Sequence, residues 1–344
     1  MSSSPATADG PPGVSLTALA SWLDREHPGL RAGDLSAQAI AGGRSNLTYR
    51  VDDGATNWVL RRPPLGHVLP TAHDMAREFT VLTALHPSPV PVPEPVVLCA
   101  DRSVLGEPFY LMSFVDGVVV DSPDLVADPV TARGTTTALV DTLLTLHGVD
   151  PASVGLADFG RPEGFLQRQI RRWHKQFESS VAEPDPTEGK VAAVLAERAP
   201  QSSRTSIVHG DYRLTNVIYR FDLSSIAAVV DWEMATLGDP LTDLGLLFVY
   251  HDQARANFGV MPDFPAAQGF LSPEQMLERY FAATGADSAD IDWYISFGFF
   301  KLGVIAAGID ARYQQGKTVG EGFDVFGAIR DESFASARSR LAAL

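Results

Sequence analysis

A polar loop between short apolar strands in the second half of the chain places strong limits on the fold. The loop runs from His209 to Asn216 and reads H-x-D-x-x-x-x-N. Apolar runs at 206–208 and 217–219 predict strands on either side of it. A third predicted strand, at 226–230, is followed directly by Asp231. A loop held in this way can bring the carboxylates of Asp211 and Asp231 and the amide of Asn216 close together.

These residue types at these spacings suit phosphoryl transfer. In that reaction one carboxylate meets the attacking hydroxyl, while a second carboxylate and an amide oxygen hold Mg²⁺ against the phosphates. Magnesium prefers hard oxygen ligands and keeps several waters, so few protein ligands are sufficient.

The first half of the chain is patterned as strands around one helix. Strands are predicted at 47–51 and 58–61 and again at 96–100 and 109–115. Residues 72–86 predict a helix in which Met75, Phe79, Leu82 and Leu85 form an apolar stripe. Glu78 lies in that stripe, and a carboxylate on a buried face needs a partner.

The second half is mainly helical, and Asp116-Gly117 marks the predicted boundary. We therefore predict an α+β fold in two lobes, with an antiparallel five-stranded N-terminal lobe and a mainly helical C-terminal lobe. The predicted organisation is a disordered tail at 1–13, an N-terminal lobe at 14–115 and a C-terminal lobe at 116–344. Helices are predicted at 133–148, 163–178, 187–198, 240–250, 273–284, 289–312 and 320–341.

Charge and composition narrow the class of partner. The 344 residues carry a formal net charge of −15, which disfavours nucleic acid and anionic membrane surfaces. Cys99 is the single cysteine, in an apolar run, so it is expected to be a buried inert thiol. The N-terminus lacks a signal-peptide pattern, and the apolar stretch 295–309 is interrupted by Lys301 and judged too short to span a bilayer. A cytoplasmic location is expected.

The two loop motifs resemble those of the aminoglycoside phosphotransferase family, the small-molecule branch of the protein-kinase fold. The chain looks closest to the kinase-like domains associated with acyl-CoA dehydrogenases and to actinobacterial phosphotransferase-like proteins. The resemblance covers roughly residues 15–340. It implies a bilobal protein-kinase-like fold, in which the N-terminal lobe binds the nucleotide and the C-terminal lobe carries catalysis and substrate binding. It is carried by the stretches 42–49, 59–64, 77–78, 108–117, 208–216 and 229–245.

The resemblance implies roles for the polar loop. Asp211 matches the catalytic aspartate, and Asn216 and Asp231 match the two metal ligands. Arg213 stands where protein kinases have a lysine near the γ-phosphate. The implied cofactors are ATP or GTP with Mg²⁺.

In the N-terminal half, Glu78 matches the helix glutamate that pairs with the basic residue of the third strand. That residue is normally lysine, whereas Arg61 stands here. An arginine keeps the charge and can grip a carboxylate bidentately. Arg62 would take the role only in a register shifted by one, which strand alternation opposes.

Further nucleotide contacts are implied by the same resemblance. Gly43, Ser45 and Asn46 would cover the phosphates with their loop amides. Backbone groups of Met112, Ser113 and Phe114 would meet adenine at a hinge that continues to Gly117, with the nucleotide between the lobes.

Several residues have a simpler structural interpretation. His209 is expected to brace the loop, and Asp239 and Asp243 are expected to be structural. Asp158-Phe159-Gly160 spells a kinase metal motif, but it precedes the catalytic loop and is interpreted as an ordinary loop. The aromatic residues Trp293, Tyr294 and Phe297 are expected in the core, and His67, His73 and His86 do not have a zinc spacing.

The function is left open between three hypotheses, two of which differ in the acceptor. The first acceptor is a polycationic, aminoglycoside-like hydroxyl compound, which would suit the acidic chain. The second is a hydroxyacyl-CoA or related metabolite, gripped by the basic segment with Arg168, Arg171, Arg172 and Trp173; Glu233 is a further possible substrate contact. The third hypothesis is a non-catalytic nucleotide-binding pseudokinase, suggested only by Arg61. Oligomeric state is not predicted.

Overall fold

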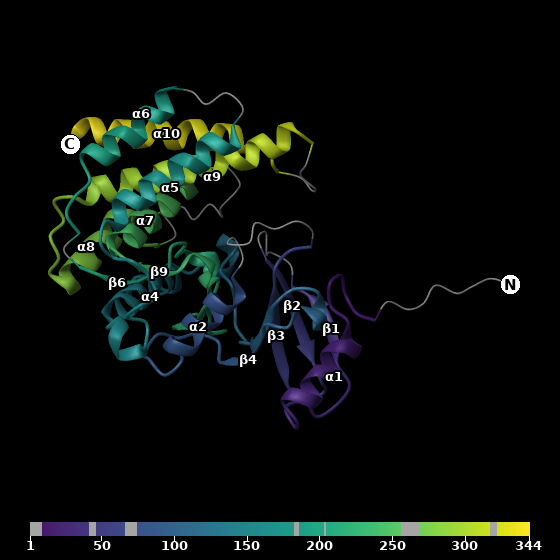
Figure 1. Cartoon of the computed structure of the whole chain (residues 1–344). Helices are drawn as coiled ribbons and strands as arrows, with labels where there is room; N and C mark the ends of the chain where they lie inside the picture. Colours follow the sequence, from purple (N-terminus) through teal and green to yellow (C-terminus); the bar gives the residue numbers. More distant parts are fainter. Residues whose placement is uncertain are drawn as a thin grey trace. The chain divides into compact units, whose positions relative to one another are not determined.

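The structure is a computed structural model of the 344-residue chain. It divides into two compact units, Met1–Asp116 and Gly117–Leu344, which are described one at a time (Figure 1). The residues that the structure describes are 9–40, 46–65, 74–181, 186–202, 204–255, 269–316 and 322–344.

The N-terminal unit is built on one antiparallel sheet with the strand order β1-β2-β3-β5-β4. The predicted five-stranded antiparallel unit is thereby confirmed. Sequence patterning did not locate β1, because this strand is short and mostly exposed and therefore has no apolar alternation. The strand bounds are β1 Ser36–Ala39, β2 Leu47–Asp52, β3 Asn57–Arg62, β4 Pro95–Cys99 and β5 Phe109–Ser113.

One face of this sheet is covered by helix α1, Leu16–Glu26, which packs beside the one-turn helix α3, Arg102–Leu105. The apolar face of α1 inserts Leu19, Trp22 and Leu23 into the core. Cys99 is buried in the same cluster, where burial raises the pKa of its thiol, so the prediction of a buried cysteine is confirmed. Burial of these side chains provides the hydrophobic stabilisation of the unit.

Helix α2, Met75–Leu85, packs against β4 and β5. It begins three residues later than predicted, because the Asp74 side chain accepts a hydrogen bond from the Arg77 N–H and caps the first turn. Val81 is fully buried, whereas Phe79 of the predicted stripe is half-buried. Glu78 is buried on the same face of α2, as its place in the stripe predicted.

Residues 9–13, expected in a disordered tail, are packed onto the N-terminal unit. Asp9 accepts hydrogen bonds from Ser15 at the start of α1, and the Tyr49 hydroxyl donates to the Pro12 carbonyl. Composition suggested disorder here, but these side-chain contacts hold the segment.

The C-terminal unit is mainly helical, as predicted, with two small two-stranded sheets, β6–β9 and β7–β8. Its helices are α4 Pro129–Gly148, α5 Phe165–Ser180, α6 Pro186–Glu197, α7 Leu241–Arg255, α8 Pro273–Thr284, α9 Ile291–Gln314 and α10 Phe326–Ala343. Its strands are β6 Ser206–Val208, β7 Val217–Tyr219, β8 Ile226–Val229 and β9 Thr236–Gly238. The fold class predicted from the sequence is confirmed.

Helix α9 is the central helix of this unit and packs against α5, α7 and α10 (Figure 1). It spans 24 residues, so the expectation that its apolar stretch is too short to cross a membrane was wrong on length. However, 78% of its apolar window is buried inside the protein, which makes it the core helix of the unit. Trp293, Tyr294 and Phe297 lie in this core, as predicted.

Candidate functional site

His209 braces the polar loop from inside the C-terminal unit. Its backbone N–H donates to Asp243 Oδ2 at 2.7 Å, and its ring Nε2 lies 3.0 Å from the Val230 carbonyl oxygen. The ring Nδ1 accepts from the Asp211 N–H at 3.2 Å, so the ring proton is on Nε2. The histidine is fully buried and is committed to backbone partners, which agrees with a bracing role.

Asp243 anchors the loop to α7. Its second oxygen accepts from the Gly210 N–H at 2.8 Å, and His147 Nε2 lies 3.3 Å from Oδ2. Burial opposes ionisation of this carboxyl, but the hydrogen bond from His147 and the nearby histidines and amides hold its pKa below the usual value. The carboxylate thus satisfies two consecutive N–H groups immediately before Asp211.

Gly210 has a positive φ of 83°, a conformation that favours glycine. A Cβ at this position would lie 2.8 Å from the Met234 carbonyl oxygen. The loop therefore passes too close to the Met234 backbone for any side chain at position 210.

The Asp211 carboxylate is oriented by neighbouring donors. Asn216 Nδ2 donates to Asp211 Oδ2 at 2.9 Å and also to the Asp211 carbonyl at 2.8 Å. Arg213 Nε lies 3.4 Å from the same Oδ2. Because the Asn216 nitrogen is used in this way, the amide oxygen is the atom of that side chain left to ligate a metal.

Asp231 follows β8 in a left-handed conformation, with φ of 69°. Such a φ is uncommon for a non-glycine residue and costs about 1–3 kcal/mol, so it persists only where the surroundings impose it. The Val230 N–H donates to the Asn216 carbonyl at 3.0 Å, which fixes the backbone before Asp231 beside the backbone of Asn216. The donor set of amide and carboxylate oxygens fits Mg²⁺.

No group of three or more His, Cys, Asp or Glu side chains that could hold a metal ion occurs among the residues described in the structure. Within the polar loop and the turn after β8, Asn216 and Asp231 are the residues that could hold Mg²⁺, with water completing the coordination.

Lys301 of α9 is a contributor to this loop that the sequence did not suggest. Its ammonium donates to the Gly210 carbonyl and lies 5.1 Å from the Trp173 ring centroid. Burial lowers the pKa of Lys301 to about 8, and the positive charges of Arg172 and Arg213 act in the same direction. In the sequence, the one feature that could have pointed to Lys301 is that it interrupts an apolar helical stretch.

In the N-terminal unit, Arg61 and Glu78 form a buried ion pair, with 2.8 Å between Nε and Oε2. Glu78 also accepts from Asn46 Nδ2 at 3.1 Å and from the Tyr110 hydroxyl at 3.0 Å. Arg62 instead donates to the carbonyls of Gly13 and Leu105. The register of β3 thus directs Arg61, and not Arg62, to Glu78.

Some of the residues predicted to contact the nucleotide belong to the described part of the chain, and others do not. Gly43 and Ser45 lie outside the described residues, whereas Asn46 contacts Glu78. The N–H of Ser113 donates to the Glu94 carbonyl and that of Phe114 to the Asn57 carbonyl, so both are used within the sheet. An adenine at this edge would have to meet the carbonyls of these residues or a later peptide group.

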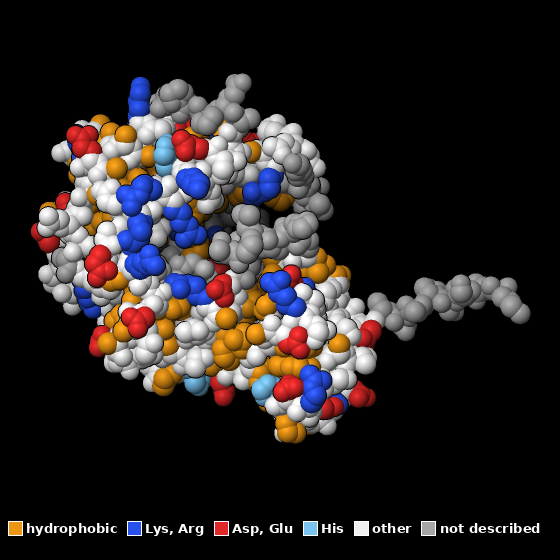
Figure 2. Space-filling model, in the orientation of Figure 1, with side chains coloured by type: hydrophobic (Ala, Val, Ile, Leu, Met, Phe, Trp, Pro, Cys, Tyr) orange, Lys and Arg blue, Asp and Glu red, His pale blue; other side chains and the backbone are white. Residues whose placement is uncertain are grey.

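The predicted substrate residues have different environments. Arg168 donates to the carbonyls of Arg161 and Glu163, which gives it a structural role at the start of α5. Arg172 is exposed, whereas Trp173 is buried in the helical core. Figure 2 shows Lys and Arg side chains gathered over this part of the C-terminal unit.

The remaining predictions concern residues outside the polar loop. Glu233 is half-buried in the turn that follows Asp231. Asp239 accepts from the Leu241 N–H at the start of α7 and from the Tyr294 hydroxyl, which agrees with the predicted capping role. Asp158 is exposed in a turn; His67 and His73 lie outside the described residues.

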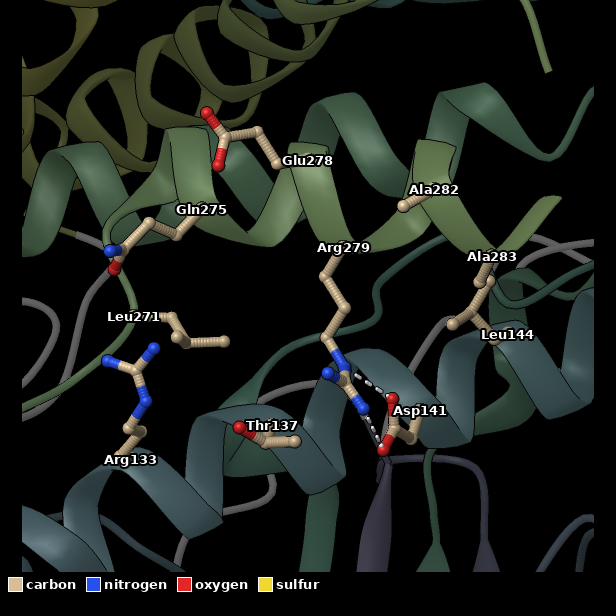
Figure 3. A pocket seen from close by; sticks show the side chains of 10 residues that line it. All are labelled: Arg133, Thr137, Asp141, Leu144, Leu271, Gln275, Glu278, Arg279, Ala282 and Ala283. Carbon is tan, nitrogen blue, oxygen red and sulfur yellow. Dashed lines mark hydrogen bonds and ion pairs between the residues drawn. The ribbon is translucent and has the colours of Figure 1, made fainter. Parts of the chain in front are cut away.

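A groove of about 620 Å³ lies between α4 and α8 (Figure 3). Arg279 bridges it with a bidentate ion pair to Asp141. None of the predicted site residues lines this groove. Its lining comprises Arg133, Thr137, Asp141, Leu144, Leu271, Gln275, Glu278, Arg279, Ala282 and Ala283.

Comparison with known proteins identifies the family. The model of the family described as "Phosphotransferase enzyme family" matches residues 36–290, a span that includes β1 to β5 and the whole polar loop. The chain belongs to this phosphotransferase family. Membership of this family supports an enzyme of the kinase type.

The chain is also similar to part of a larger curated protein. It is 31% identical to acyl-CoA dehydrogenase family member 11 of Gallus gallus over 297 residues, which cover 84% of this chain but 38% of that protein. The chain therefore spans less than half the length of this relative.

Solved structures agree on the fold. A Ralstonia eutropha protein solved as an aminoglycoside phosphotransferase-like protein is 31% identical, with a TM-score of 0.78 and coverage of 94% of this chain and 98% of that one. An aminoglycoside phosphotransferase variant in ternary complex with AMP-PNP and hygromycin B is 16% identical, with a TM-score of 0.60 and coverage of 94% and 98%, which shows a shared fold.

Proposed function

We propose that this phosphotransferase is an ATP- and Mg²⁺-dependent kinase that transfers the γ-phosphate to a hydroxyl of a small molecule. The observation that carries the proposal is the braced loop in which Asp211 is oriented by Asn216 and backed by His209 and Asp243. Phosphoryl transfer requires a rigid arrangement of side chains of this kind, because catalysis of this reaction is almost entirely positioning and electrostatic stabilisation.

In this proposal Asp211 meets the acceptor hydroxyl. The hydroxyl oxygen forms a bond to the γ-phosphorus while the bond from that phosphorus to the β,γ-bridging oxygen breaks, and ADP leaves. The hydroxyl proton passes to Asp211 or to the transferred phosphoryl group. Because the transition state is loose, Asp211 acts mainly by orienting the hydroxyl.

Asn216 and Asp231 would hold the magnesium ion, which supplies charge neutralisation at the phosphates when bound. Arg213 lies beside Asp211 and would contribute a positive charge near the transferred group. Arg61, held by Glu78, would meet the α- and β-phosphates, and the segment with Gly43, Ser45 and Asn46 would supply amides to them.

Two classes of small-molecule acceptor fit this proposal. The similarity to the Ralstonia eutropha aminoglycoside phosphotransferase-like protein and the net charge of −15 favour a polycationic, aminoglycoside-like compound. The similarity to acyl-CoA dehydrogenase family members and the exposed Arg172 favour a hydroxyacyl-CoA or a related anionic metabolite. A pseudokinase role is the alternative if arginine at position 61 does not support turnover.

The test measures nucleotide consumption with ATP or GTP and Mg²⁺ over a panel of aminoglycosides, amino alcohols, sugars and hydroxyacyl-CoAs. Asp231→Ala is the blank, and Asp158→Ala, an exposed aspartate in a turn, is the matched control. Acceptor-dependent turnover that is lost in Asp231→Ala and kept in Asp158→Ala is expected. Nucleotide binding without turnover on any acceptor would instead favour the pseudokinase.

A further inference from the structure

Tyr250 of α7 contacts the predicted catalytic aspartate directly, although it is separated from it by 39 residues. Its hydroxyl donates a hydrogen bond to Asp211 Oδ1. The tyrosine is 6% exposed, and the Arg213 guanidinium lies 5.3 Å from its ring centroid. Neither the motif nor the helical pattern assigns a role to this residue.

The direction of the hydrogen bond follows from the environment of the phenol. Burial raises the pKa of Tyr250 well above its usual value, and the neighbouring Asp211 charge acts in the same direction. The phenol therefore keeps its proton and donates, and the carboxylate accepts.

Each oxygen of the Asp211 carboxylate consequently has its own donor. Oδ1 accepts from Tyr250, while Oδ2 accepts from Asn216 Nδ2 at 2.9 Å. Two donors on opposite oxygens fix the rotation of the carboxylate about its last torsion, which is otherwise broad. Tyr250 is itself held by packing within the buried face of α7.

We propose that Tyr250 is a positioning residue that fixes the Asp211 carboxylate in the orientation from which it meets the acceptor hydroxyl. This proposal rests on the proposed kinase function and adds to it a residue outside the polar loop. Without the phenol hydroxyl, Oδ1 loses its donor and the carboxylate can rotate away from the acceptor. Misplacement of a catalytic group by about 1 Å can reduce a rate by about 100-fold.

The test compares Tyr250→Phe with Tyr294→Phe. Tyr294 is a matched control because it is also a buried tyrosine whose hydroxyl donates to an aspartate, Asp239, at 2.8 Å. The wild type, Asp211→Ala and both phenylalanine variants are assayed with an acceptor from the panel, and phosphoryl transfer to acceptor and hydrolysis to inorganic phosphate are measured separately.

We expect Tyr250→Phe to reduce kcat roughly 10- to 100-fold, with KM for nucleotide and acceptor nearly unchanged. The ratio of transfer to hydrolysis should also fall, whereas both quantities should stay near wild type in Tyr294→Phe. Partial misfolding of the variant would lower transfer and hydrolysis together, so it would not change their ratio.

A wild-type kcat in Tyr250→Phe, with turnover abolished in Asp211→Ala, would overturn the positioning role and leave the kinase function standing. Equal loss in Tyr250→Phe and Tyr294→Phe would also overturn it. Full turnover in Asp211→Ala, or no acceptor-dependent turnover in the wild type, would overturn the kinase function and the inference with it.

Discussion

The buried ammonium of Lys301 donates a hydrogen bond to the Gly210 carbonyl oxygen, which places a cation of α9 directly behind the loop that carries Asp211. Asp211 and Asp243 favour its charge, but burial outweighs them and lowers the pKa of Lys301 to about 8. Because burial disfavours the charge of this lysine, its presence here indicates a role other than stabilising the fold.

Replacement of Lys301 by methionine should therefore separate stability from activity. Methionine has a similar length and fills the same space without a buried charge, so the free energy of unfolding near pH 7 should rise by roughly 1–3 kcal/mol. Turnover should fall, because the Gly210 carbonyl loses its donor and the loop loosens. Denaturant unfolding and steady-state kinetics on the same preparations check this, and a less stable variant would contradict it.

The pH dependence of this difference is a separate prediction. The folded-state pKa of about 8 lies below the usual lysine value of 10.5, so the unfolded state binds more protons between these values. The free energy of unfolding of the wild type should therefore rise with pH above about 8 relative to Lys301→Met. The gap between the two proteins should narrow between pH 7 and about 9.5. A gap that does not depend on pH would show that Lys301 keeps its usual pKa.

The Arg61–Glu78 pair should show strong coupling in a double-mutant cycle. Glu78→Ala leaves the 8% exposed Arg61 without its carboxylate and removes the acceptor of Asn46 and Tyr110, and it should cost about 3–5 kcal/mol. Arg61→Met in that background should cost little more, because the buried charge is then gone. Additive losses would contradict the pairing.

Arg62→Met is the matched control for the nucleotide role of Arg61. Both arginines are buried in β3, but Arg62 donates to main-chain carbonyls of Gly13 and Leu105. Arg62→Met should lower the unfolding free energy of the N-terminal unit and leave KM for nucleotide unchanged. Arg61→Met should raise KM for nucleotide several-fold. The reverse pattern would assign the phosphates to Arg62.

Gly210→Ala should disable the loop, and Gly106→Ala provides the comparison. Both glycines have positive φ values, 83° and 88°, but a Cβ at 106 meets nothing within 4 Å whereas one at 210 collides with Met234. Gly106→Ala should cost about 1 kcal/mol from its backbone conformation alone. Gly210→Ala should cost more and abolish turnover. Thermal unfolding and steady-state kinetics check both variants. Equal effects would show that the Met234 backbone moves away to accommodate a Cβ at position 210.

The parts of this protein that depend on local pattern could be predicted from the sequence. The spacing of His209, Asp211 and Asn216 identified the loop, because a short motif encodes its own backbone geometry. Helix and strand periodicity gave the division into a sheet-based and a helical unit, since burial of one face imposes a period on the chain. Glu78 was found by the same reasoning, because a carboxylate in an apolar stripe signals a buried partner.

The distant side chains that contact the loop could not be predicted, because they depend on how the helices of the C-terminal unit pack. Tyr250 and Lys301 reach it across 39 and 91 residues, and both lie on helices whose apolar pattern reports burial but not the neighbour. Strand alternation favoured Arg61 over Arg62, but both arginines of β3 are buried, and only the structure shows that Arg62 contacts the carbonyls of Gly13 and Leu105. Sequence patterns record which faces are buried, whereas the packing of one element on another determines what each buried polar group contacts.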